Sequence, residues 1–427
     1  MKNLAAALAL AVLAAAGHAQ NVGETLTLGE AVSLAVKNSP AALAAEQDII
    51  VARQRVREAR FLAMPQIAFS GSLNKVNLEY PAVLGGDLGD RLIYPSASDA
   101  FYSLRAQALQ PLYTGGKNTN TLKLAKTAHN QARVDFDSVR ADAALAAKRS
   151  FYTLLYQRRL SAVSAAWETR ARELASAASK DAFETLEADL LLAGLADQAR
   201  HAGRGEEAAR TELLRVLNKE PGWQVEVEGE FAVQPVDTGV GTSLVTAMET
   251  RSELKSELYK AQMDDIAVNM AMVRRYPTIY LGAIYDVNAY RLSSLSDEND
   301  RSSNWLASVS IHFPLSYDIW TQVQQRKAQR RQGELKRAEL QDKVRFEIVS
   351  AHKDALFWQA EAEKLGAKTE AARAAYDKAA RAGKPSMPSL RALCALCALE
   401  GKYLQAVYNQ LLARIRLEWA QGKDLSR

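Results

Sequence analysis

The chain has 427 residues, of which 48% are hydrophobic and 24% are charged. This length and composition exclude a disordered chain and allow a large buried core. The formal net charge of +5 is small for the length, and basic residues alternate with acidic ones, which argues against a nucleic-acid-binding patch.

The first twenty residues have the pattern of a secretory signal peptide. Lys2 precedes an apolar run over residues 4–16, and a small-x-small triplet ends at Ala19. We expect residues 1–19 to be a signal peptide; a short buried N-terminal helix is the alternative. No later run of 18 apolar residues predicts a transmembrane helix, so the exported chain is either soluble or inserted in a membrane by strands.

The chain after the signal opens with a helical pattern over residues 26–61, which we expect to end before Pro65. Two strands with one apolar and one polar face follow, joined by a polar loop over residues 78–98. The predicted apolar faces consist of Ile67, Phe69, Gly71 and Leu73 in the first strand, and of Tyr102, Leu104, Ala106 and Ala108 in the return strand.

The stretch QPLYTGGKNTN then passes from a strand pattern to a helix pattern with almost no loop. We expect Pro111 to end the strand ladder, and Gly115 and Gly116 to allow the unusual backbone dihedrals of a sharp turn.

A heptad seam follows from Lys117 to about Ala178, and it predicts a helix on the order of 90 Å long at about 1.5 Å per residue. A free-standing coiled coil is also compatible with this seam. The seam positions are Leu122, Ala125, His129, Ala132, Phe136, Val139, Ala143, Ala146, Ser150, Thr153, Gln157 and Leu160.

The same order of patterns occurs a second time. FLAMPQIAFSGSL matches VRRYPTIYLGAIY, LQPLY matches HFPLS, and TLEADLLLA matches SLRALCALC, each at an offset of roughly 200 residues. We therefore expect a first repeat over residues 20–218, an inter-repeat linker rich in Pro and Gly over residues 219–242, and a second repeat over residues 243–427.

The second repeat also contains a predicted strand hairpin, with a loop over residues 291–304. Its junction with the following helix keeps a proline, Pro314, but lacks the glycine pair. The apolar faces are formed by Ile279, Leu281, Ala283, Tyr285 and Val287, and by Trp305, Ala307, Val309, Ile311 and Phe313.

Strands of about ten residues can cross a membrane when tilted, although the hairpins also fit a soluble sandwich. In a bilayer every backbone amide must be paired, which requires a closed barrel. Four strands cannot close a barrel, since known single-chain barrels begin at about eight strands. A membrane-inserted chain would therefore have to share its barrel with other copies.

The sequence resembles the TolC family of outer-membrane efflux and secretion channels over essentially its whole mature length. The most specific segments are LTLGEAVSLAVKNSP at the start, QPLYTGG at the junction, and AGKPSMPSLRAL with LLARIRLEWAQGKDL at the end. The chain departs from the family in lacking glycines at the second junction and in its short C-terminus.

The resemblance implies a mainly α fold with β strands, in which four strands per chain form one twelve-stranded transmembrane barrel in a homotrimer. Long helices would continue this barrel into the periplasm. The tips of the helical hairpins would dock a periplasmic adaptor protein and an inner-membrane pump, while outer-membrane lipid surrounds the strands. The residues that we expect at these tips are Ser179, Asp181, Glu184, Gly383, Ser386 and Leu390.

Cys394 and Cys397 form a CxxC pattern that could bind a metal or form a disulfide, although both fit the packing of an Ala- and Leu-rich helix. The acidic residues near the first tip could narrow a cation-favouring mouth or form a solvated helix face. The remaining histidines, His129, His201, His312 and His352, show no metal-ligand spacing.

No phosphate-binding loop, catalytic carboxylate pair or nucleophile elbow occurs in a convincing context, so we predict no enzyme activity, no cofactor and no nucleic-acid partner. The sequence favours the outer-membrane channel of a tripartite efflux or type I secretion system, a passive duct gated at its tips. A soluble periplasmic coiled-coil scaffold is the alternative. An exported hydrolase would need a convergent catalytic set that the sequence does not offer.

Overall fold

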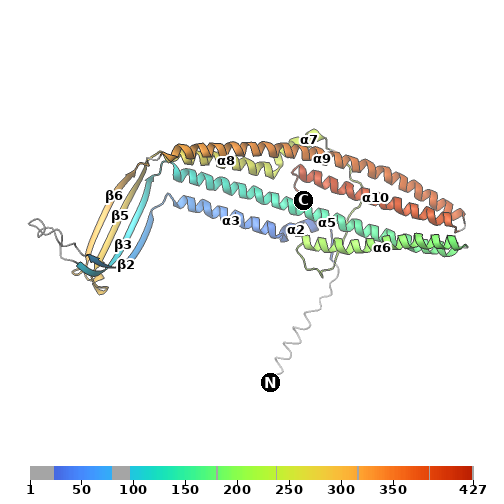
Figure 1. The fold of residues 1–427 in the computed structure, drawn as a ribbon, viewed down its shortest axis with the longest axis horizontal. Helices are drawn as coiled ribbons and strands as arrows, with labels where there is room; N and C mark the ends of the chain where they lie inside the picture. Colours follow the sequence, from blue (N-terminus) through green and yellow to red (C-terminus); the bar gives the residue numbers. More distant parts are fainter. Residues whose placement is uncertain are drawn as a thin grey trace, which may run out of the picture. The chain divides into compact units, whose positions relative to one another are not determined.

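The computed structural model describes residues 24–78, 97–178, 181–236, 238–314, 317–383 and 385–425 (Figure 1). The predicted signal peptide, nearly all of the predicted first loop, and Ser179 lie outside these ranges. The chain divides into two compact units, which are described separately. The first comprises Met1–Ile49, Ala132–Glu257 and Lys336–Arg427, and the second comprises Ile50–Gln131 and Leu258–Leu335.

The second unit contains an antiparallel sheet of four strands in the order β2-β3-β5-β6 (Figure 1). Its strands are β2 (Gln66–Leu78), β3 (Ala97–Tyr113), β5 (Thr278–Ala289) and β6 (Ser302–His312). The central β3–β5 ladder joins the hairpin of the first predicted repeat to that of the second. Within the described residues, β2 and β6 are the edge strands of this sheet.

The register of the sheet confirms the predicted strand faces. Phe69 pairs with Ala106, Ala106 with Tyr285, and Tyr285 with Trp305. Because directly opposed residues point to the same face, all four predicted apolar sets lie on one side of the sheet. The described residues on the other side are mostly polar.

The described helices repeat in the same order around each hairpin: α2, α3, β2, β3, α5 and α6 are followed by α7, α8, β5, β6, α9 and α10. None of these helices combines the length and the apolar character that a bilayer-crossing helix requires. Their bounds are α2 (Leu28–Asn38), α3 (Pro40–Phe61), α5 (Lys117–Ala178), α6 (Ala182–Val216), α7 (Val240–Thr250), α8 (Ser252–Val273), α9 (Asp318–Ala382) and α10 (Met387–Ala420).

The predicted helix from Lys117 to Ala178 is confirmed as α5. The prediction of one helical pattern over residues 26–61 was wrong, because α2 ends at Asn38 and α3 begins at Pro40. Ser39 adopts an extended conformation between them, as expected for a residue that precedes proline. Leu26 belongs to a short strand, and Thr27 caps α2 in a reciprocal capping box with Glu30.

The first unit is built around an apolar core at which distant segments meet. The short strands β1 (Glu24–Leu26) and β4 (Val225–Val227) pair in parallel, and Leu26 and Val227 are both buried there. Phe151 of α5 and Leu411 of α10 belong to the same cluster. The predicted linker over residues 219–242 therefore contains an ordered strand, and α7 begins within its last residues.

The seam predicted along α5 is not the face that the chain itself buries in the first unit. The buried side chains of α5 include Ala144, Ala147, Phe151 and Leu154, each one position after a seam residue. Of the seam residues in this stretch, Ala146 is exposed and Thr153 is partly exposed, whereas Ser150 is buried. The heptad period was therefore read correctly, but the seam residues do not form this chain's own core.

Candidate functional site

One face of the sheet exposes an apolar surface that a soluble protein would be expected to cover. Phe69 is 80% exposed and Trp305 is 79% exposed, and both lie in the row that runs across all four strands. Leu73, Leu281, Val309 and Ile311 are further exposed large apolar residues.

Aromatic residues occur at two places on this apolar face. Phe69, Tyr285 and Trp305 lie in one row across the sheet, and Tyr113 and Phe313 lie near the helical end of the strands. Leu73 and Leu104 continue the apolar face beyond the row. Trp305 and Phe313 are about 27 Å apart along the strand at about 3.4 Å per residue. A tilt of about 40° would reduce this to about 21 Å across the bilayer, close to the apolar band of roughly 25 Å in membrane barrels.

At the first strand-helix junction the ladder does not end at Pro111, contrary to the prediction. Pro111 pairs with Tyr280, a register shift follows, and Tyr113 pairs with Ile279. The shift inserts one extra residue, which is how an antiparallel ladder can pass a proline that lacks an N–H donor. It also brings Tyr113 to the apolar face, opposite Ile279.

The two predicted glycines lie directly after this strand and adopt positive φ angles, 62° at Gly115 and 94° at Gly116. A Cβ atom at Gly115 would lie 2.8 Å from Cβ of Tyr276 and 3.3 Å from the carbonyl oxygen of Val273. Gly115 therefore allows both a left-handed turn and the close approach of the end of α8.

Two amide side chains that the sequence analysis did not single out also hold this junction. The Gln110 amide donates to the carbonyl of Ala63 at 3.0 Å, and the Asn118 amide donates to the carbonyl of Leu62 at 2.8 Å. Both acceptors lie between α3 and β2, so the two strand-helix junctions of the first hairpin are tied together. Only the polar composition of QPLYTGGKNTN hinted at these bonds.

The second junction has a different set of contacts. Pro314 follows β6, and residues 315–316 lie outside the described ranges. Arg274 at the end of α8 contacts Asp318 at 4.0 Å, and the Arg275 guanidinium lies 5.2 Å from the ring centre of Trp320 in α9. An ion pair and a cation–π contact thus occur at the junction that lacks the glycine pair.

At the first helical tip, Asp181 caps the N-terminus of α6 and accepts a hydrogen bond from the backbone of Ala182 at 2.7 Å. Glu184 lies in the first turn of α6, where a negative charge is favourable. At the second tip, Gly383 is exposed after α9, and Ser386 caps α10 in a reciprocal capping box with Ser389.

Leu390 differs from the other predicted tip residues because it is fully buried. It packs in a cluster with Trp167 of α5 and Tyr376 of α9, so its side chain offers no surface to a partner in this state. The exposed apolar residues near the first tip are instead Phe183, Leu186 and Leu190 on α6. Their i, i+3, i+7 spacing within FETLEADL was a readable signal of one helix face.

Two sets of charged contacts join the helical hairpins close to their tips. The Arg391 guanidinium of α10 donates to both carboxylate oxygens of Glu187 in α6, at 2.6 and 2.5 Å. Deeper in the unit, Glu400 of α10 accepts from the Trp167 indole at 2.7 Å and lies 3.7 Å from Arg373. The Arg391–Glu187 and Trp167–Glu400 contacts link the first helical hairpin to the second, whereas Arg373 and Glu400 lie within the second hairpin.

Cys394 and Cys397 are both free thiols on α10. Cys397 is buried in the same apolar cluster as Leu390, and burial raises its pKa to about 11. Burial also raises the pKa of Cys394. Because metals and oxidants react with the thiolate, these environments favour the packing interpretation of the CxxC pattern.

We expect the pair to be chemically inert at neutral pH. Maleimide should label Cys397 at pH 7.5 at least about 100-fold more slowly than a free cysteine thiol, because its high pKa leaves little thiolate. Replacing both residues, Cys394→Ser with Cys397→Ser, should leave transport and metal sensitivity unchanged. Rapid labelling of the folded protein, or lost metal response in the double variant, would contradict this expectation.

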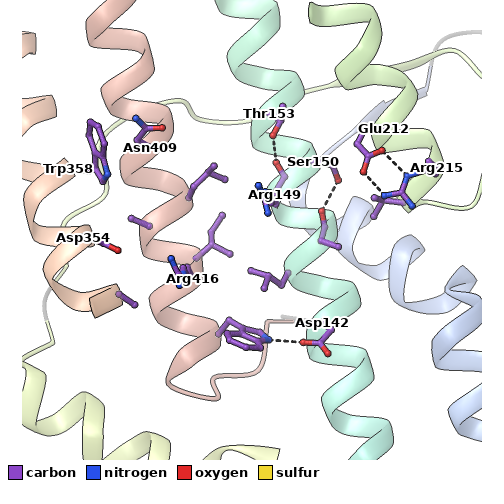
Figure 2. Close-up of a pocket in the computed structure, with 18 residues that line it drawn as sticks. Asp142, Arg149, Ser150, Thr153, Glu212, Arg215, Asp354, Trp358, Asn409 and Arg416 are labelled. Carbon is purple, nitrogen blue, oxygen red and sulfur yellow. Dashed lines mark hydrogen bonds and ion pairs between the residues drawn. The ribbon is translucent and has the colours of Figure 1, made fainter. Parts of the chain in front are cut away.

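A cavity of about 860 Å³ lies in the first unit among α5, α6, α9 and α10 (Figure 2). Its lining includes the seam residues Ala146, Ser150 and Thr153, and it combines apolar side chains with charged ones. The Trp419 indole donates to Asp142 at 2.9 Å at one end of the cavity (Figure 2). Ala146 and Thr153, the two seam residues of this stretch that are not buried, thus line the cavity.

Across the described ranges, no three His, Cys, Asp or Glu residues gather as a metal-binding group. The histidines stay dispersed: His352 is buried against the carbonyl of Thr238 at 2.7 Å, and His201 lies on α6 beside Asp197. The described residues offer an apolar sheet face and two helical tips held by packing and charged contacts.

Comparison with known proteins identifies this fold. Residues 31–182 match the sequence family described as outer membrane efflux protein. No curated protein matches the chain in sequence.

Solved structures match nearly the whole chain. The CmeC outer membrane channel of Campylobacter jejuni is 15% identical with a TM-score of 0.79, and the alignment covers 93% of this chain and 87% of CmeC. For the outer membrane protein VceC of Vibrio cholerae the identity is 14%, the TM-score 0.77 and the coverage 93% and 96%. For the open state of the MtrE outer membrane channel of Neisseria gonorrhoeae the values are 14%, 0.78, 93% and 89%.

These comparisons agree with the resemblance stated from the sequence. Residues 31–182 of the chain therefore match the outer membrane efflux protein family, and its described residues have the fold of solved outer-membrane channels.

Proposed function

We propose that this chain is the outer-membrane channel of a tripartite efflux or type I secretion system, and that three copies share one twelve-stranded barrel. The observation that carries the proposal is the exposed apolar face of the four-stranded sheet, which includes the aromatic residues Phe69, Trp305 and Phe313. Within the described residues, β2 and β6 are the unpaired edges of this sheet, which supports a barrel shared between copies, because an unpaired edge in hydrocarbon costs several kcal/mol per amide.

The soluble scaffold accounts for the long helices but not for this sheet. A scaffold would expose Phe69, Trp305 and their apolar neighbours to water across four strands. A lipid-facing position makes the same side chains favourable. The exposed residues Phe183, Leu186 and Leu190 near the first tip suit contact with the periplasmic adaptor, and an inner-membrane pump would supply the energy.

Incorporation of the purified protein into planar lipid bilayers tests the channel function directly. Discrete, stable conductance steps are expected from the detergent-extracted protein. Absence of conductance, together with recovery of the protein in the soluble periplasmic fraction, would favour the scaffold.

We propose that the contact between Glu187 and Arg391 holds the two hairpin tips of each chain together in the closed state. Both side chains are partly exposed, 38% for Glu187 and 58% for Arg391, so the contact is weak enough to be broken by a docking partner. We expect Glu187→Gln to raise the mean conductance about twofold or more, since a pore's resistance is greatest at its narrowest point.

The matched control is Glu212→Gln. Glu212 forms a similar bidentate contact with Arg215, but both residues belong to α6, so this contact joins no separate helices. The control should conduct like the parent protein. An unchanged conductance for Glu187→Gln would show that this contact does not hold the tips closed.

The same contact predicts a pH dependence. The hydrogen bond from Arg391 lowers the pKa of Glu187 below its ordinary value of 4.5. A depressed carboxylate pKa stabilises the closed tip above pH 4.5, and this stabilisation is lost as the pH falls through the lowered pKa. Conductance should therefore stay constant near neutral pH and rise only below about pH 4.5. A rise between pH 6 and 7 would point to a different group.

A further inference from the structure

The polar face of the sheet carries one bidentate ion pair near its centre. Nε of Arg105 in β3 lies 2.6 Å from one carboxylate oxygen of Asp286 in β5, and its Nη2 lies 3.2 Å from the other. The two residues are direct partners in the β3–β5 ladder. The pair therefore crosses the boundary between the hairpin of the first predicted repeat and that of the second.

The strand register places this pair in a row that is otherwise uncharged. Arg105 pairs with Ser70 on its other side, and Asp286 pairs with Asn304. The neighbouring rows on the same face have no charged side chain. They consist of Ala68, Gln107, Ile284 and Leu306 on one side, and of Ser72, Ser103, Asn288 and Ser302 on the other. Over these three rows, the charge of the face is that of Arg105 and Asp286 alone.

We propose that the Arg105–Asp286 pair keeps the wall of the barrel lumen electrically neutral at the height of its row. This inference rests on the proposed function, in which the apolar face meets lipid and the polar face lines the pore. Three copies of the pair would then lie at one height in the channel. Each carboxylate cancels the field of the guanidinium it binds, so the ring allows substrates of either charge to pass.

Removing the charge of either residue would leave the charge of the other uncompensated. Asp286→Asn would leave three uncompensated positive charges in the ring, and Arg105→Gln would leave three negative ones. At 0.1 M salt the Debye length is about 10 Å, so such a ring would act on multivalent ions that enter the barrel.

Single-channel recording in about 0.1 M KCl tests the proposal, with the blocker added on the side of the sheet's loops. Sucrose octasulfate, a polyanion, should half-block the Asp286→Asn channel at a concentration about tenfold lower than it needs for the parent. Hexaamminecobalt(III), a trivalent cation, should likewise block Arg105→Gln at a lower concentration than the parent. The double variant Arg105→Gln with Asp286→Asn should respond to both blockers as the parent does.

Asn304→Lys provides an independent test that leaves the ion pair intact. Asn304 is an exposed residue of the same row, so this variant should also gain sensitivity to sucrose octasulfate. Variants that conduct normally but keep the parent's sensitivity to both blockers would overturn the proposal while leaving the channel function standing. A parent protein that forms no channel would overturn both.

Discussion

Val309→Lys should abolish assembly in the outer membrane. Val309 lies midway along β6 between Trp305 and Phe313, and it is exposed on the apolar face opposite Leu281. A lysine at the bilayer midplane costs about 2–4 kcal/mol, which amounts to about 6–12 kcal/mol in a trimer. Fractionation of cells that express the variant, with detection of the protein in each fraction, measures the effect.

Ser308→Lys is the matched control for this variant. Ser308 is the adjacent residue of β6, and its register partner Gly282 places it on the polar face. This lysine should be tolerated, because the polar face is expected to be in contact with water. Equal tolerance of both substitutions would contradict a lipid-facing sheet, since a soluble scaffold gains solubility from lysine at either position.

Gly115→Ala should lower the stability of the assembled protein by about 2–5 kcal/mol per chain. A left-handed φ costs a residue with a side chain roughly 1–2 kcal/mol, and crowding against a packed neighbour adds about 1–3 kcal/mol. Both costs apply at Gly115, which has φ 62° and a contact of 2.8 Å between its added Cβ and that of Tyr276. The unfolding temperature of the detergent-purified protein reports the change.

Two further glycines give this prediction a graded control. Gly116 has φ 94°, but a Cβ there would meet its nearest atom at 3.7 Å, so Gly116→Ala should have a smaller effect. Gly194 lies within α6 with nothing within 4 Å of an added Cβ, and Gly194→Ala should stabilise the helix by about 0.5–1 kcal/mol. An unfolding temperature for Gly115→Ala at or above that of Gly194→Ala would refute the role assigned to the junction.

Features that depend on local periodicity could be predicted from the sequence. Alternation of apolar and polar residues gave the faces of all four strands of the sheet, and the long run of heptads gave the bounds of α5. Both signals repeat within a few residues, so neighbouring positions reinforce one another.

Features that depend on contacts between distant segments could not be predicted. The β1–β4 pairing joins two strands of three residues each, too short to show a period. The Glu187–Arg391 contact and the burial of Leu390 arise only when separate hairpins meet. The bulge after Pro111 is also a property of the pairing, because a proline alone indicates either the end of a ladder or an extra residue within it.

The protein mass of the particle extracted from outer membranes tests the central claim most directly. The measurement is light scattering of the mature chain in detergent, with the detergent contribution subtracted. The shared barrel predicts three chains per particle. A monomer or dimer that stays soluble without detergent would contradict the channel and leave the periplasmic scaffold as the better explanation of the long helices.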